Sequence, residues 1–111
     1  MNNFKTCLTQ CISIIDILES KKYNLTYGTT SILNFQKQIN KNNNGLDEYF
    51  NITVSTQLSG FISIDLIYKK KLENSTNTIT INRLLSPGIS TLSNEIETVE
   101  KSLLLIGSYY I

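Results

Sequence analysis

The chain has 111 residues and a formal net charge of +1, and 17% of its residues are charged, against about 25% in typical proteins. This length favours a single domain, 1–111, that buries a core without disulfides or metal ions. The weak charge argues against nucleic-acid binding, which needs clustered Lys and Arg, whereas the longest basic run here is Lys69-Lys70-Lys71.

The amino-acid composition is unusual. There is no Ala, His or Trp, and 16 Ile and 13 Asn stand beside only two Val. This pattern is typical of an A/T-rich genome. A net charge near zero gives little protection against association, so it favours a chain that works inside an assembly.

No secretory signal or membrane-spanning segment is predicted. The start, Met1-Asn-Asn-Phe-Lys5, lacks the order of a basic region followed by an apolar one, and no apolar run approaches the ~20 residues of a spanning helix. We therefore expect the chain in the cytoplasm, an organelle interior or an assembly such as a virion.

The first predicted element is an amphipathic helix over residues 3–21, and 24–28 then break its pattern. Its apolar residues recur at helical spacing, and Ile14 and Ile17 widen the stripe, which predicts burial on more than one side. The stripe consists of Phe4, Cys7, Leu8, Cys11, Ile12, Ile15 and Leu18.

Four strands are predicted next, at 30–39, 48–57, 61–70 and 77–84, because apolar and polar residues alternate in each. An Asn-rich segment, 40–45, predicts a loop between the first two. Ser86-Pro87-Gly88 ends the sheet region, since proline cannot continue a central ladder.

A second amphipathic helix is predicted from Ile89 to the last residue, capped by Ser90 or Ser93. One seam at spacings of three and four predicts the face that packs on the sheet. The seam consists of Leu92, Ile96, Val99, Leu103, Ile106 and Tyr110.

Together these elements predict an α+β fold: a helix, a four-stranded antiparallel meander and a second helix, with both helices on one face of the sheet. The order is similar to that of double-stranded-RNA-binding domains. Those domains place lysines at the start of the second helix, where this chain has Asn94, Glu95 and Glu97. No family is therefore assigned.

Residues capable of chemistry are few, and each is interpreted structurally. Cys7 and Cys11 lie four apart on a helix, without a His to act as base or to complete a metal site, so core packing is favoured over redox or catalytic roles. Asp47-Glu48 is expected on a loop surface.

Two further charged residues lie in the predicted sheet. Asp65 shares a strand face with Ser63, which favours solvation or pairing with Arg83 over an acid with a raised pKa. Arg83, the one guanidinium, is expected to act as a structural ion-pair partner rather than as an anion site.

The leading hypothesis is a non-catalytic small subunit or assembly module, without a cofactor or metal, that binds a protein partner or copies of itself through its apolar closing helix. The expected contact residues are Leu103, Leu104, Leu105, Tyr109 and Tyr110. The alternative is a small-molecule or lipid-binding domain. Its pocket between helices and sheet would be lined by Phe35, Phe50, Phe61 and Tyr68.

Overall fold

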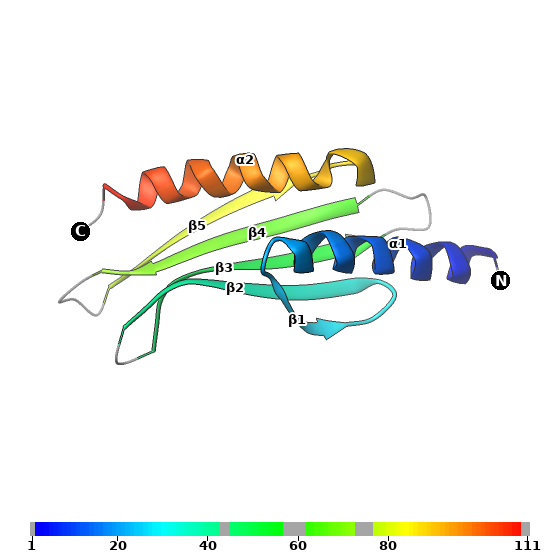
Figure 1. The fold of residues 1–111 in the computed structure, drawn as a ribbon, viewed down its shortest axis with the longest axis horizontal. Coiled ribbons are helices and arrows are strands. Elements are labelled where there is room, and N and C mark those ends of the chain that lie inside the picture. The colour runs from blue at the N-terminus through cyan, green and yellow to red at the C-terminus, as the bar shows by residue number, and fades with distance from the viewer. Residues whose placement is uncertain (1, 43–44, 57–61, 73–76, 110–111) are drawn as a thin grey trace.

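Two helices pack on one face of a five-stranded antiparallel sheet in the computed structural model, which describes residues 2–42, 45–56, 62–72 and 77–109 (Figure 1). The predicted α+β class is confirmed, but the prediction of four strands is wrong. The elements are α1 (Asn2–Ser20), β1 (Asn24–Gly28), β2 (Ile32–Asn42), β3 (Gly45–Thr56), β4 (Ile62–Lys71), β5 (Thr78–Leu85) and α2 (Ile89–Gly107). The strands lie side by side in chain order, as a meander.

The additional strand is β1, where a break in the helix pattern predicted only a connection. It pairs antiparallel with β2, with an irregularity between Leu25 and Tyr27. All five of its residues are exposed, so backbone hydrogen bonds rather than burial hold it in the sheet. Its alternation is limited to Leu25 and Tyr27, which is too short a pattern to distinguish a strand from a connection.

The hairpin between β2 and β3 is longer than the Asn-rich segment suggested. Pairing continues to Asn42 and Gly45, so most of the predicted loop at 40–45 belongs to the strands. Cross-strand backbone bonds outweigh the weak strand preference of Asn here. The sequence also predicts turns at 58–60 and 73–77 between the later strands; these residues lie outside the described ranges, except for Asn77.

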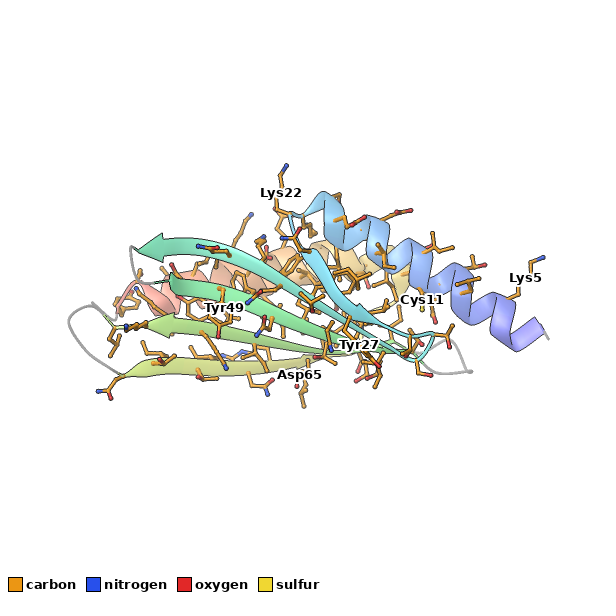
Figure 2. The ribbon with its side chains drawn as sticks, turned by 90° about the horizontal axis from the view of Figure 1, so that it is seen from below. Lys5, Cys11, Lys22, Tyr27, Tyr49 and Asp65 are labelled. Atoms are coloured by element: carbon orange, nitrogen blue, oxygen red, sulfur yellow. The ribbon has the colours of Figure 1, made fainter. Side chains whose placement is uncertain are left out.

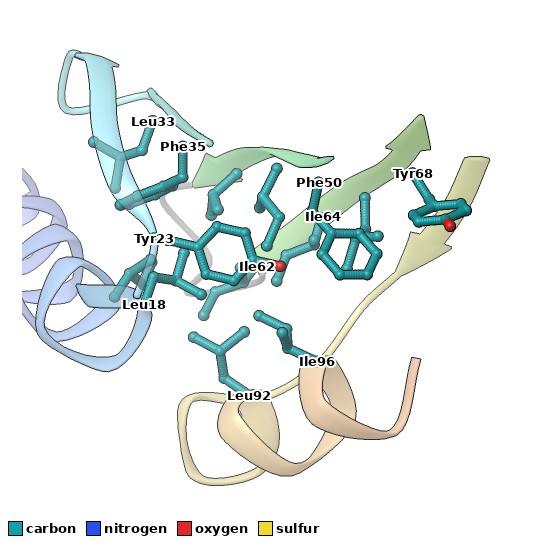
Figure 3. Packing of buried hydrophobic residues seen from close by; sticks show 14 of the residues in the cluster. Leu18, Tyr23, Leu33, Phe35, Phe50, Ile62, Ile64, Tyr68, Leu92 and Ile96 are labelled. Atoms are coloured by element: carbon teal, nitrogen blue, oxygen red, sulfur yellow. The ribbon is translucent and has the colours of Figure 1, made fainter. Parts of the chain in front are cut away.

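The core lies between the helices and one sheet face, as the strand alternation predicted (Figure 3). Cross-strand neighbours on this face include Phe35 with Ile52 and Phe50 with Tyr68, whose rings lie 5.3 Å apart. The predicted seam of α2 is confirmed where it is described: Leu92, Ile96 and Leu103 are fully buried, Val99 and Ile106 pack against the cluster, and Tyr110 lies outside the described residues.

The packed stripe of α1 differs from the prediction. Its buried residues are Cys11, Ile14 and Leu18, whereas Leu8 and Ile12 are 43% and 52% exposed. Ile15 and Ile17 are partly buried and also pack against the core, so Ile14 and Ile17 widen the stripe as predicted, and among the described side chains only Leu8 and Ile12 depart from it. Figure 2 shows its first turns, near Lys5, projecting beyond the sheet, where no strand lies beneath them.

The end of α1 forms a tight backbone cap that directs Tyr23 into the core. Tyr23 N–H donates to the Leu18 carbonyl and Lys22 N–H to the Glu19 carbonyl, both at 3.0 Å. Lys22 has a φ of 75°, the left-handed conformation that this helix end requires. Tyr23 and Leu18 are both buried, so the apolar contact that accompanies such a cap is also present.

The start of α2 also differs from the prediction. Gly88 is the N-cap residue, and its N–H donates to the Thr91 hydroxyl at 3.2 Å. The expected caps, Ser90 and Ser93, lie inside the helix instead. Pro87 fixes the chain one residue before the cap, which sets the helix start earlier than the serines suggested.

The opposite sheet face is polar, and no described helix covers it. Its residues include Tyr27, Tyr49 and Asp65, which Figure 2 labels on the strands. Ser, Thr, Asn and Gln occupy most other positions of β2 and β3 on this face. Such a face is hydrated mainly through uncharged polar side chains, in keeping with the low charge content.

Candidate interaction surface

The C-terminal turns of α2 leave three large side chains uncovered: Leu104, Leu105 and Tyr109, which are 36%, 61% and 79% exposed. We call these three residues the outer surface of α2. Leu103 belongs to the chain's own core and is fully buried, so it is not available to a partner. Tyr110, the fifth expected contact residue, lies outside the described residues.

Close packing on the sheet positions this end of α2. A Cβ added at Gly107 would overlap the Tyr68 hydroxyl and lie 2.8 Å from its Cζ, so the helix backbone rests directly on the ring. The Tyr68 hydroxyl donates to the Glu48 carboxylate, and Lys70 Nζ donates to the Gly107 carbonyl at 2.7 Å. A lysine here satisfies a helix-end carbonyl and suits the helix dipole.

Glu48 corrects the expectation of an acidic pair on a loop. It lies in β3 and is buried, opposite Lys70 on β4, while the side chain of Asp47 is outside the described set. Burial raises the pKa of Tyr68 above its ordinary value, and its hydrogen bond to the Glu48 carboxylate raises it further.

A second polar cluster fastens the middle of α2. Glu100 is buried and accepts hydrogen bonds from the Tyr23 hydroxyl at 2.5 Å and from Lys37 Nζ at 2.8 Å. Lys37 also donates to the Lys21 carbonyl at 3.1 Å, and its Nζ lies 4.9 Å from the centre of the Tyr23 ring. This cluster joins the connection between α1 and β1, strand β2 and helix α2.

Burial is the largest cause of the raised pKa of Tyr23, and the hydrogen bond and charge of Glu100 raise this pKa further. Tyr23 therefore stays protonated and donates to the carboxylate. Hydrogen-bonded charge pairs of this kind hold elements in one arrangement, because separating them would strand a buried charge.

An exposed ion pair borders this cluster. Glu97 lies 3.3 Å from Lys101 Nζ, one helical turn away, and 3.5 Å from Lys21 Nζ. Its hydrogen bond to Lys101, with the charges of both lysines, holds the pKa of Glu97 below its ordinary value. Because this ion pair is exposed to solvent, it contributes little to stability.

The thiol of Cys11 packs as predicted. Cys11 is buried in the core, and its Sγ lies 3.6 Å from the Thr30 carbonyl in the turn between β1 and β2. The side chain of Cys7 is outside the described set. The core-packing interpretation is therefore confirmed for Cys11 alone.

Asp65 lies on the open sheet face, as expected, but not in free water. It is half-buried, and its Oδ1 is buried without a hydrogen-bond partner among the described residues. The predicted pairing with Arg83 is wrong, because Arg83 lies opposite Leu66 on the helix-covered face, whereas Asp65 lies on the open face. Arg83 is exposed and donates to the Asn82 carbonyl at 3.3 Å, and it forms no ion pair within the described part of the chain.

The residues expected to line a pocket are packed instead. Phe35, Phe50 and Tyr68 are at most 1% exposed and belong to the continuous core, and Phe61 lies outside the described residues (Figure 3). A side chain that lines an open pocket exposes surface within it. This burial weighs against the ligand-binding alternative.

Metal-ligating groups do not gather in the described residues, where no three His, Cys, Asp or Glu side chains could hold an ion together. Within the same ranges, neither helix has the length and apolar content needed to span a bilayer.

The sequence pattern did not predict the two polar clusters, although the residue spacing of α2 contained one indication of them. Glu100 lies four residues after Ile96 and three before Leu103, so it falls on the buried flank of the seam. An acid at such a position requires a partner. No spacing identifies Tyr23 or Lys37 as that partner, because both come from distant segments.

No family model, curated protein or solved structure matches this chain. What it does must therefore be inferred from its own residues and their arrangement.

Proposed function

We propose that this chain is a non-catalytic subunit or interaction module that binds a partner protein through the outer surface of α2. The observation that carries the proposal is the exposure of Leu104, Leu105 and Tyr109 together on a helix end that is fixed to the sheet from below. Adjacent large apolar side chains in the open are more typical of interaction sites than of isolated monomers.

Composition and chemistry of this surface agree with a protein partner. Tyrosine is enriched at interfaces because its ring is apolar and its hydroxyl tolerates water. The nearby charges, Glu97 and Lys101, pair with each other, so the surface offers no concentrated charge to an ionic ligand. Burying a fully exposed side chain of this size contributes about 1.5–3 kcal/mol, and each of these three would contribute in proportion to the part that is still exposed.

The test compares complexes isolated with the tagged chain from the cells that naturally contain it. Leu104 and Leu105 are 36% and 61% exposed, so Leu104→Ser combined with Leu105→Ser removes about 1.5–3 kcal/mol of apolar contact, which corresponds to at least about a tenfold loss of affinity for the partner. Both side chains are exposed, so the variant should remain folded by circular dichroism.

A matched control removes similar apolar surface elsewhere. Leu8→Ser with Ile12→Ser acts on exposed residues of α1 and should leave the partner bound. Equal retention of the partner by both double variants would refute the proposal. Isolation of the unmodified chain from these cells only as a 12.6 kDa monomer would also refute the proposal.

A further inference from the structure

The two edges of the sheet differ in how open they are to another strand. β1, at one edge, has five residues and an irregular register after Leu25. β5, at the other edge, has eight residues in unbroken register with β4 and contains neither Pro nor Gly. Short or bulged edges resist pairing with other chains, whereas long regular ones invite it.

One backbone bond shows which groups of β5 face outward. Leu72 N–H donates to the Asn77 carbonyl at 3.0 Å, so these two residues form a hydrogen-bonded pair of the antiparallel ladder. Pairs alternate along such a ladder, so Ile79, Ile81 and Arg83 turn their backbone groups toward β4. The residues between them direct N–H and C=O to the open edge; they are Thr78, Thr80, Asn82 and Leu84.

We propose that a second copy of this chain pairs with β5, antiparallel, about a two-fold axis at Ile81, giving a continuous ten-stranded sheet. This register pairs Thr78 with Leu84 of the second copy and Thr80 with its Asn82, and symmetry repeats both pairs. Every outward residue thereby gains a partner. Moving the register by two residues would leave one of them unmatched in each copy.

The side chains of β5 also complement themselves in this register. On the helix-covered face, Ile81 lies opposite Ile81 of the second copy, and Arg83 lies opposite its Ile79. The two arginines, the only charged residues of the paired strands, are therefore not opposite each other. Ile79 and Ile81 are half-buried within one copy, and the second copy would extend the apolar layer over them. A net charge of +1 adds little repulsion between copies.

α2 supplies a second layer to this contact. Gly107 lies on Tyr68, which pairs with Ile81, so the last turn of α2 is beside the proposed axis. Glu100 marks the flank of α2 that faces β2, since it binds Lys37. Ile106 follows Glu100 by six residues, which at about 100° per residue places it on the opposite flank, and the proposed symmetry would bring these flanks of the two copies together.

This second layer matters because strand pairing alone buries little surface, and stable dimers usually bury at least about 1,200 Å². The inference does not depend on the partner proposed for the outer surface. Leu104 follows Glu100 by four residues and belongs to the flank that faces away from the axis.

The test is sedimentation velocity of the purified chain alone, between about 1 and 200 μM. Thr80 and Asn82 are exposed, and the proposed register places each opposite the other. Thr80→Lys with Asn82→Lys opposes like charges twice across the axis, whereas Thr80→Glu with Asn82→Lys opposes unlike charges twice. We expect the wild type and the Glu/Lys variant to sediment as dimers of the 12.6 kDa chain.

The Lys/Lys variant should show a dissociation constant at least about tenfold higher than that of the Glu/Lys variant at low salt, and added NaCl should narrow the difference. Leu104→Ser should sediment as the wild type does. Thermal unfolding of each variant confirms that it is folded.

Three results would overturn the inference. A wild-type chain that is monomeric throughout the range excludes the dimer. A Lys/Lys variant as dimeric as the wild type places the contact elsewhere. Equal weakening of the Lys/Lys and Glu/Lys variants rejects the register. None of these results bears on the partner of the outer surface, because only the isolated chain is present.

Discussion

Replacing Gly107 by alanine tests whether α2 rests on Tyr68 as closely as the structure shows. In an ordinary helix this change stabilises the protein by up to about 1 kcal/mol, because glycine is a poor helix former. Here the added Cβ would overlap the Tyr68 hydroxyl and come within 2.8 Å of Cζ. The ring or the helix end must therefore move.

Either movement has a cost. Displacing the ring disturbs the bond from Tyr68 to the Glu48 carboxylate, and lifting the helix stretches the bond from Lys70 to the Gly107 carbonyl. Overpacking a filled core costs about 1–3 kcal/mol. After the gain in helix propensity, we expect a net loss of up to about 2 kcal/mol in the free energy of unfolding.

Urea titration followed by circular dichroism measures this loss. Tyr68→Phe removes the atom that the Cβ overlaps most, so the double variant should be about 1 kcal/mol more stable than the sum of the single effects implies. Ser102→Ala, on the exposed side of α2, is the control and should change stability by no more than about 0.5 kcal/mol. A Gly107→Ala protein that gains stability, or additive single effects, would refute the close contact.

Three further predictions concern the polar clusters and the cap of α1. Glu100→Gln should cost about 1–3 kcal/mol in urea titration, because it strands the Lys37 charge, and adding Lys37→Met should recover part of that loss; no recovery would contradict the pairing. Tyr23 and Tyr68 have raised pKa values, so their contribution to the free energy of unfolding is complete below the unfolded-state pKa near 10 and falls above it, by about 1.4 kcal/mol per pH unit for each residue. The free energy of unfolding, measured from pH 9 to 11, should therefore decline less steeply in Tyr23→Phe than in the wild type. An unchanged slope would contradict this. Lys22→Gly should stabilise by about 1 kcal/mol, measured as a higher urea midpoint, because φ is 75°; a loss of stability would show that the lysine side chain outweighs its backbone strain.

Elements defined by apolar periodicity could be predicted from the sequence, and those held by backbone bonds could not. The seam from Leu92 to Ile106 was correct because burial on one helix face leaves a spacing of three and four. β1 was missed because its alternation of polar and apolar residues extends only over Leu25 and Tyr27. The Asn-rich segment was misread because residue preferences in a hairpin yield to cross-strand pairing.

The outer surface of α2 was partly predictable for the same reason. Leu104, Leu105 and Tyr109 fall off the seam, so their exposure follows from helix geometry, whereas Leu103 lies on the seam and is buried. The buried acids were not anticipated. A carboxylate such as Glu48 has the same place in a sequence whether water or a distant tyrosine hydroxyl satisfies it, and only the fold distinguishes the two.

The polar contacts beneath α2 also set how a partner would meet its outer surface. Glu100 and the Gly107 carbonyl are fastened to the sheet seven residues, or about 10 Å, apart along the helix. The backbone between them is already ordered, so association does not have to supply the roughly 1–2 kcal/mol per residue that ordering a free segment costs. Binding at Leu104 and Leu105 should thus proceed as the docking of preformed parts, with association rate constants of about 10⁵–10⁷ M⁻¹s⁻¹ and little gain in helix content.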